Sequence, residues 1–237
     1  MIEAVIFDWG GTLSVYVDIE MEDMWGMAAQ HLAAATDPDR EDEIRNCLVK
    51  VEAEAWARIP IDQRSFTLAQ LLATASDALQ LDVTAAVVEQ ARQGHLEAWT
   101  RHIRHDPEAA EVLAALKGRG LKIGLLSNTH WPREFHEHFL ARDGLVEHID
   151  ARLYTSEMTY SKPHASAFRA ALDAVGVADP ARAVFVGDRA YDDIFGAQQA
   201  GMRGVLRPHP YVPGYDVQPD AVIGRLPELL DLIQGWA

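Results

Sequence analysis

Ala4-Val5-Ile6-Phe7-Asp8-Trp9-Gly10-Gly11-Thr12-Leu13 is the stretch of this chain that decides its fold. The apolar run at its start is too short for a helix and ends near a pair of glycines, which is typical of a buried parallel strand. Such a strand brings Asp8 to the carboxyl edge of its sheet, where open α/β sheets bind ligands. A carboxylate there can act as a nucleophile or metal ligand, and the amides of the glycine pair can hold an anion. Taken alone, the stretch also fits a strand followed by a turn that caps a helix.

The composition limits the classes of partner. The 237 residues are enough for a substantial core, and the formal net charge is -15. Lys and Arg do not cluster, so we expect no nucleic-acid partner. Cys47 is the single cysteine, which excludes an internal disulfide, and we expect it to be a core thiol in a reducing compartment. With no basic N-terminal region and no apolar run of membrane-spanning length, we expect a cytoplasmic protein without a membrane partner.

Helical periodicity dominates residues 15–104. Asp37 before Pro38, and Thr84, are expected helix caps. No strand pattern interrupts this part, so we predict an all-helical cap domain inserted after the first strand. The apolar positions of its four expected helices are Met21, Met24, Trp25, Ala28 and Leu32; Ile44, Leu48, Val51 and Ala55; Leu68, Leu71, Leu72, Ala75 and Leu79; and Val87, Val88, Ala91, Trp99 and Ile103.

From Asp106 onward, strand and helix patterns alternate, which predicts βαβ units around a parallel sheet. We therefore predict an α/β fold: a three-layer, doubly wound parallel sheet formed by residues 1–14 and 105–237, with residues 15–104 as the helical cap. The proline-rich segment 208–219 is expected to be a loop. Expected strands cover residues 122–126, 151–154, 183–186, 204–207 and 221–223, and expected helices cover residues 108–119, 132–142, 163–175 and 192–200.

Four motifs place polar residues at the ends of the expected strands. They read D-W-G-G-T-L from Asp8, S-N-T from Ser127, S-K-P-H around Lys162, and G-D-R-A-Y-D-D-I-F-G-A from Gly187. In type, order and spacing they resemble the haloacid dehalogenase-like (HAD) superfamily, in particular its phosphatase-type members with an inserted helical cap. The resemblance covers the whole chain. Each motif is moderately specific, and the four in order make coincidence improbable.

The resemblance implies a Mg²⁺-dependent hydrolase that acts on a small phosphorylated molecule. Asp8 would attack phosphorus to form an aspartyl-phosphate, and Lys162 would neutralise charge on the nucleophile and the phosphoryl group. Hydrogen bonds to the phosphoryl oxygens would come from the amides of Gly11 and Thr12 and from Ser127, Asn128 and Lys162. Asp8, the Gly10 carbonyl, Asp188 and Asp193 would hold the metal.

Gly10 departs from the phosphatase pattern D-x-D-x-T, whose second aspartate protonates the leaving group and then activates water. Glycine keeps the backbone carbonyl for the metal but removes the acid. The loss of a positioned general acid costs on the order of 10²- to 10⁴-fold in rate. The substrate would then carry a good leaving group, or a cap residue such as Glu22, Asp23 or Glu54 would supply the proton.

Two other functions stay open. The chain is similar to phosphonoacetaldehyde hydrolase, a HAD relative with a small residue at this position and a cap lysine that forms a Schiff base; Lys50 is the cap lysine here, although base rates favour an exposed surface lysine. Alternatively, the protein has lost catalysis and binds a phosphorylated ligand. Dehalogenation is the weaker expectation, because the resemblance assigns Asp188 and Asp193 to the metal-dependent pattern. The sequence does not indicate an oligomeric state.

Residues beside the motifs suggest a substrate pocket. His130 and Trp131 directly follow the S-N-T motif and should lie where a loop meets the cap, and Trp9 should face the same entrance. We interpret the remaining His residues as scattered surface side chains rather than a second metal site; they are His102, His105, His136 and His138.

Overall fold

The computed structural model describes residues 1–236 and has an α/β fold with a six-stranded parallel sheet. The spatial order of the strands is β3-β2-β1-β4-β5-β6, with β1 at the centre between β2 and β4. This order confirms the predicted doubly wound sheet. The strands are β1 Ala4–Phe7, β2 Lys122–Ser127, β3 Ala151–Tyr154, β4 Ala183–Gly187, β5 Arg203–Leu206 and β6 Ala221–Val222.

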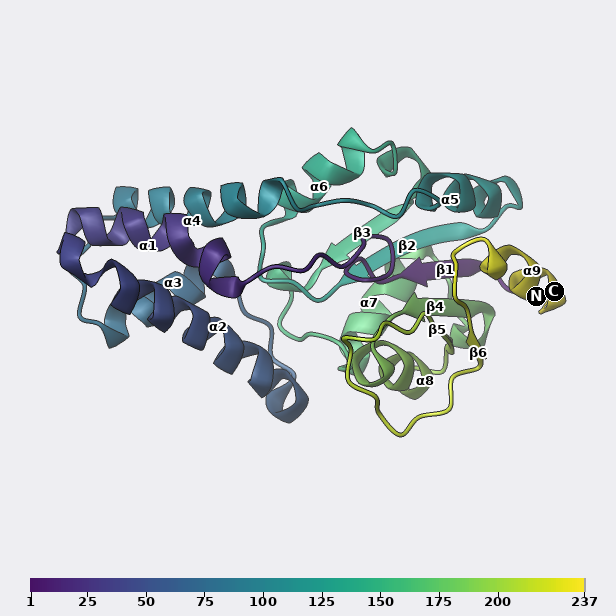
Figure 1. Cartoon of the computed structure of the whole chain (residues 1–237). Coiled ribbons are helices and arrows are strands. Elements are labelled where there is room, and N and C mark those ends of the chain that lie inside the picture. Colours follow the sequence, from purple (N-terminus) through teal and green to yellow (C-terminus); the bar gives the residue numbers. More distant parts are fainter. Residues whose placement is uncertain (237) are drawn as a thin grey trace.

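Helices cover both faces of the sheet (Figure 1). One face packs against α5 (Ala109–Gly118), α6 (Arg133–Arg142) and α9 (Glu228–Gly235). The other packs against α7 (Ala165–Val175) and α8 (Gly196–Gln199). Sheet and helices thus form the three predicted layers.

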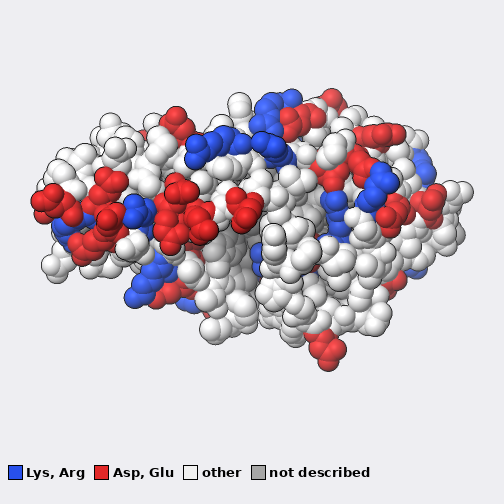
Figure 2. All heavy atoms as spheres, viewed as in Figure 1, with Lys and Arg blue, Asp and Glu red and all other residues white. Residues whose placement is uncertain are grey.

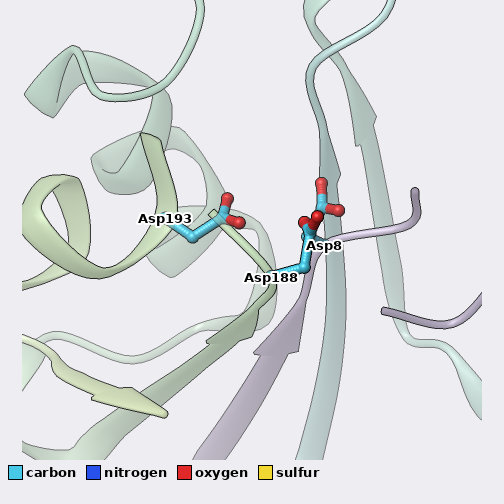
Figure 3. A group of neighbouring side chains, drawn as sticks. All are labelled: Asp8, Asp188 and Asp193. Atoms are coloured by element: carbon cyan, nitrogen blue, oxygen red, sulfur yellow. The ribbon is translucent and has the colours of Figure 1, made fainter. Parts of the chain in front are cut away.

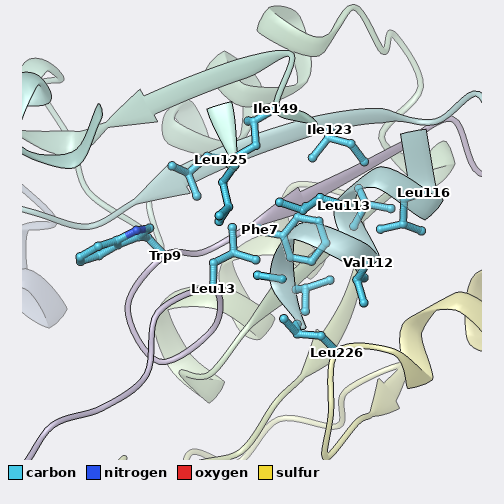
Figure 4. Packing of buried hydrophobic residues seen from close by; sticks show 14 of the residues in the cluster. Phe7, Trp9, Leu13, Val112, Leu113, Leu116, Ile123, Leu125, Ile149 and Leu226 are labelled. Carbon is cyan, nitrogen blue, oxygen red and sulfur yellow. The ribbon is translucent and has the colours of Figure 1, made fainter. Parts of the chain in front are cut away.

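The central strand shows why this sequence forms a buried strand. Successive side chains of a strand point to opposite faces, and here both faces are covered. Val5 and Phe7 belong to the hydrophobic cluster under α5 and α6, and Ala4 and Ile6 to the cluster under α7. Figure 4 shows Phe7 among the side chains of the first cluster and Trp9 at its edge. The strand is therefore apolar on both sides, as parallel strands are, and Asp8 is its first polar residue.

Helices α1 to α4 follow β1 in the chain, precede α5 and form a lobe beside the sheet (Figure 1). Their apolar stripes meet in a hydrophobic cluster that is separate from the two clusters of the sheet. They are α1 Met21–Ala35, α2 Glu41–Asp62, α3 Leu68–Ala78 and α4 Ala85–Thr100. The inserted helical region is confirmed, and the domain boundaries at residues 14 and 105 stay a prediction.

Backbone hydrogen bonds join the helical lobe to the sheet region at two places. The segments that leave and re-enter the sheet region pair through Val15 N–H to Arg104 O (3.0 Å) and Asp106 N–H to Leu13 O (2.8 Å). On the other side, Leu68 N–H at the start of α3 donates to His130 O at 2.8 Å, and Ser65 N–H in the linker between α2 and α3 donates to Thr159 O at 3.2 Å. The lobe therefore lies against the carboxyl edge of the sheet.

Three expectations about local structure need correction. The helix expected over residues 192–200 is a π-helical turn, Ala190–Phe195, followed by the short α8. Helix α9 was not predicted, although Leu229 and Ile233 bury one face of it. Cys47, expected in the core, is only half-buried.

Asp and Glu side chains gather over the helical lobe on the face seen in Figure 2, which is hollowed where the lobe meets the sheet region. Over residues 1–236, no helix combines the length and the apolar composition that crossing a membrane requires.

Candidate active site

Asp8 directly follows β1 and is buried at the carboxyl edge of the sheet. Its backbone N–H continues the sheet ladder by donating to Val186 O at 2.8 Å. Gly11 allows the sharp turn after it: its φ is +74°, and a Cβ at this position would collide with the Tyr16 ring and approach Asp188 Oδ2 to 2.8 Å. The glycine pair therefore lets the chain turn tightly beside the carboxylates.

Lys162 joins two of the predicted acidic residues. Its fully buried ammonium donates to Asp8 Oδ1 at 2.6 Å and to Asp193 Oδ1 at 2.7 Å. Burial alone would lower the lysine pKa, but the charges of Asp193 and Asp8 raise it above its ordinary value. The lysine is therefore a fixed positive charge beside the Asp8 carboxylate.

Asp8 directly follows β1, Asp188 directly follows β4, and Asp193 lies in the π-helical turn Ala190–Phe195; their side chains lie near one another (Figure 3). Each offers a carboxylate oxygen, and these oxygens lie within 4.8 Å of one another. Gly187 makes room for the cluster, because a Cβ there would collide with the Asp193 side chain. Asp193 is held by the Arg189 N–H, which donates to its Oδ2 at 2.9 Å.

The three carboxylates carry more negative charge than the lysine alone can balance. Burial raises the pKa of Asp8 to about 6; the charge of Lys162 acts to lower this pKa, and the charge of Asp193 acts to raise it. Burial and the charges of Asp193 and Asp8 raise the pKa of Asp188 to about 8. Both shifts mean that the ionised cluster is stabilised by an additional cation.

The donor set fits a hard divalent cation. Mg²⁺ prefers oxygen ligands, usually one or two carboxylates together with water. Asp188 Oδ1 is buried and accepts no hydrogen bond from residues 1–236, so one oxygen of the cluster has no partner within the described protein. Gly10 lines the same cavity as Asp8, and its carbonyl as a metal ligand stays a prediction.

Tyr16 is a site residue that the sequence reasoning missed. Its hydroxyl donates to Asp188 Oδ2 at 2.5 Å, and its ring lies 4.2 Å from that of His209. The tyrosine thus occupies one oxygen of Asp188 and leaves the other free. No sequence pattern indicates this contact, because Tyr16 lies in the irregular segment between β1 and α1.

The predicted phosphate-binding side chains of Ser127, Thr12 and Asn128 differ in whether hydrogen bonds within the protein already occupy them. Ser127 is buried and lines the cavity. Thr12 Oγ1 is buried without a hydrogen-bond partner in the described chain. Asn128 is committed elsewhere: its Nδ2 donates to Lys162 O and its Oδ1 accepts from Lys162 N, both at 2.9 Å. This clamp makes Asn128 a positioning residue for Lys162.

A cavity of about 540 Å³ extends from Asp8 and Lys162 to the helical lobe. Trp9, His130 and Trp131, which the sequence suggested as pocket residues, all line it. Trp9 directly follows Asp8, and its Nε1 donates to His105 Nε2 at 3.0 Å, which fixes the position of the indole. The lobe contributes Met21, Glu52, Trp56, Ile59, Pro60 and Trp99.

Two of the histidines that we interpreted as surface side chains, His105 and His136, are enclosed near this cavity, as is the suggested pocket residue His130. His130 and His136 are buried, and burial lowers the pKa of each to about 3. His105 is largely enclosed between Trp9 and Asp143. They pack with aromatic rings, such as Trp9 on His136 at 4.7 Å, rather than forming a metal site.

Glu52 is the acidic residue that the helical lobe places in the cavity, and the sequence reasoning missed it. It is buried and accepts hydrogen bonds from Trp25 Nε1 (2.7 Å) and Trp56 Nε1 (3.3 Å). The signal that could have found it is its spacing: Ile44, Leu48 and Glu52 follow one another at intervals of four along the buried face of α2.

The cap residues that we considered lie elsewhere. Glu22, Asp23 and Glu54 are exposed and do not line the cavity, so none can donate a proton to the leaving group in this arrangement. The side chain of Lys50 is 74% exposed and pairs with Glu54 at 3.8 Å. The cavity therefore lacks the cap lysine that a Schiff-base mechanism requires.

Comparison with protein families gives a match over most of the chain. A model described as haloacid dehalogenase-like hydrolase matches residues 2–201. A phosphoserine phosphatase of Thermus thermophilus is 37% identical over 128 residues, which are 52% of this chain and 49% of that protein. A glyceraldehyde 3-phosphate phosphatase of Pyrococcus furiosus is 30% identical over 138 residues, or 56% of each. The chain thus spans about half the length of these two relatives.

Three further similarities extend over nearly the whole of both chains. A glyceraldehyde 3-phosphate phosphatase of Methanopyrus kandleri is 29% identical over 243 residues, covering 100% of this chain and 99% of that protein. A HAD phosphatase structure from Thermococcus onnurineus has a TM-score of 0.67 at 22% identity and covers 99% of both chains. A 2-haloacid dehalogenase structure from Pseudomonas syringae pv. Tomato DC3000 has the same TM-score at 23% identity and covers both chains completely. At these identities the two structures support the fold alone.

Proposed function

This chain belongs to the haloacid dehalogenase-like hydrolase family, and from that premise we propose that it is a Mg²⁺-dependent phosphatase acting on a small phosphorylated metabolite. One observation carries the proposal: Lys162 joins Asp8 to Asp193, and Asp188 offers a carboxylate oxygen within 4.8 Å of an oxygen of each of them. Relatives named as phosphatases of glyceraldehyde 3-phosphate and phosphoserine support the substrate class.

Asp8 is the nucleophile of the proposed reaction. One of its oxygens bonds to phosphorus while the ester oxygen leaves, which gives an aspartyl-phosphate and an alkoxide. Water then attacks phosphorus, so that phosphate departs and the carboxylate is restored. Lys162 stabilises negative charge during both transfers, because its ammonium is held 2.6 Å from Asp8 Oδ1.

The remaining residues position the reacting groups. Asn128 fixes the backbone of Lys162. The hydroxyls of Thr12 and Ser127 and the amides of Gly11 and Thr12 hydrogen-bond the phosphoryl oxygens in this proposal. Asp8, Asp188, Asp193 and the Gly10 carbonyl would hold Mg²⁺ directly or through water, and the ion would supply positive charge to the nucleophile and the phosphoryl oxygens.

The leaving alkoxide needs a proton, and Gly10 has no side chain that could donate one. The cavity histidines are neutral near pH 7, since burial lowers the pKa of His130 and His136 to about 3. We infer that water protonates the leaving group. Turnover should therefore depend strongly on the leaving group, with aryl and acyl phosphates faster than alkyl phosphates.

A phosphate-release screen over phosphomonoesters tests the proposal. Wild type with Mg²⁺ should release phosphate, most rapidly from p-nitrophenyl phosphate, and EDTA or Asp8→Asn should abolish the release. Wild-type protein that binds phosphomonoesters but releases no phosphate from any of them would instead identify a binding protein. Release that persists in Asp8→Asn would exclude Asp8 as the nucleophile.

A further inference from the structure

The helical lobe contributes to the cavity a buried carboxylate that pairs with no Lys or Arg of the described residues. Glu52 lines the cavity and is held by the indoles of Trp25 and Trp56. Within residues 1–236, neither Lys nor Arg forms an ion pair with it. The nearest basic group is His130, whose Nδ1 lies 3.8 Å from Glu52 Oε1.

His130 does not balance this carboxylate near pH 7. Burial lowers its pKa to about 3, so the imidazole is neutral. The two cations that line the cavity are Lys162, which bonds Asp8 and Asp193, and Arg189, which follows the metal-site residue Asp188. Two neutral indole donors reach Glu52, but within residues 1–236 no Lys or Arg pairs with it, and a buried charge without an opposite charge is costly. The cavity beside Glu52 therefore favours a ligand group that brings positive charge.

Aromatic faces surround the same space. Trp9, Trp56, Trp99 and Trp131 all line the cavity. Trp131 lies 4.9 Å from Trp99 and 6.0 Å from Trp9, measured between ring centroids. Aromatic rings attract cations electrostatically, and rings grouped around a space recognise alkylated ammonium groups. The carboxylate and the rings thus favour the same kind of ligand.

Unpartnered polar groups indicate that this part of the cavity is built for a ligand. Both ring nitrogens of His130 and the Nε1 atoms of Trp99 and Trp131 are buried without a hydrogen-bond partner in the described chain. Buried polar groups in proteins are normally satisfied. A ligand or water within the cavity would supply the missing partners.

We propose that the substrate of this enzyme is a phosphomonoester whose organic part carries an ammonium group, primary or alkylated, and that Glu52 with the surrounding tryptophans binds this group. The inference rests on the proposed phosphatase function, since the phosphoryl group is placed at Asp8 and Lys162. Glu52 acts as a specificity-determining residue and takes no part in the bond changes.

Charged and neutral ligands of equal shape test this proposal. Phosphocholine and 3,3-dimethylbutyl phosphate differ by replacement of nitrogen with carbon, and phosphoethanolamine pairs in the same way with propyl phosphate. Each is measured as a competitive inhibitor of p-nitrophenyl phosphate hydrolysis, which does not require fast turnover of alkyl phosphates. At least one charged ligand should bind about tenfold or more tightly than its neutral partner.

Glu52→Gln keeps the size of the side chain and an acceptor for the indoles but removes the charge. This variant should bring the ratio of the two inhibition constants close to one and leave the neutral ligand unchanged. Glu54→Gln is the matched control, because Glu54 lies on the same helix but is exposed and outside the cavity. It should retain the wild-type ratio.

Equal binding within both pairs in wild type would overturn the inference, as would tighter binding of a neutral polyol phosphate such as glycerol 3-phosphate. If Glu52→Gln does not fold, the comparison in wild type decides alone. If wild type hydrolyses no phosphomonoester, the proposed function fails, and calorimetric binding of the same pairs to Asp8→Asn still tests the ammonium site. The two failures are therefore distinguishable.

Discussion

Gly10→Asp should convert this enzyme into an efficient hydrolase of alkyl phosphates. Position 10 lines the cavity beside Asp8, and no heavy atom lies within 4 Å of a Cβ built there. The backbone at Gly10 also lacks the positive φ that would strain another residue. A carboxyl group can therefore be added without displacing its neighbours, and nearby carboxylates would raise its pKa, which favours the protonated form that an acid needs.

The size of the effect follows from the chemistry that the side chain restores. A positioned general acid contributes on the order of 10²- to 10⁴-fold in rate, which corresponds to about 2.7–5.5 kcal/mol of activation free energy. The gain should appear in kcat for alkyl phosphates. It should be small for p-nitrophenyl phosphate, whose leaving group departs without protonation.

The assay is phosphate release at saturating Mg²⁺ from glycerol 3-phosphate and from p-nitrophenyl phosphate, for wild type, Gly10→Asp and Gly10→Asn. The asparagine variant has nearly the same shape but no acid, so it should remain at the wild-type rate. An equal gain in Gly10→Asn, or an equal gain for both substrates in Gly10→Asp, would refute the reasoning that only an acid is missing.

Two further variants test how the site is held together. Burial raises the pKa of Asp188 from 3.8 to about 8, so metal-free protein should lose stability as pH rises from about 4 to about 8. In EDTA, Asp188→Asn should therefore match wild type in thermal unfolding near pH 4 or below, and should exceed it by an increasing margin up to about pH 8. A constant difference across pH would contradict this. Asn128→Ala removes two hydrogen bonds to Lys162 and should cost about 1–3 kcal/mol in urea unfolding and lower kcat; unchanged stability and kcat would show that the clamp is dispensable.

The sheet and its strand-end residues could be predicted because their signals are local. The run Ala4–Phe7 is apolar on both faces and stops at Asp8, and the strand pattern at residues 151–154 coincides with β3. In a parallel sheet, the carboxyl ends of strands meet at one edge. The order of the motifs therefore predicted that Asp8, Lys162 and Asp188 would meet.

The cavity could not be predicted in the same way, because its residues come together only through packing of the lobe on the sheet. Glu52 is one of several acidic residues of its helix, and its residue type does not mark it as buried. Its indole partners Trp25 and Trp56 come from two helices, so the sequence does not show that they meet. His130 and His136 have no periodic pattern that marks them as buried. Tyr16 reaches Asp188 from an irregular segment, where side-chain direction does not follow from spacing.

The most direct test of the account is whether phosphate becomes attached to Asp8 during turnover. Wild-type protein is mixed with p-nitrophenyl phosphate and Mg²⁺ and quenched in acid within the first turnover. It is then digested with a protease, and the masses of its peptides are measured by mass spectrometry. The account predicts one added phosphoryl group on the peptide that contains Asp8, absent in Asp8→Asn and in EDTA. Phosphate release by wild type without this modification, or with the phosphoryl group on another residue, would contradict it.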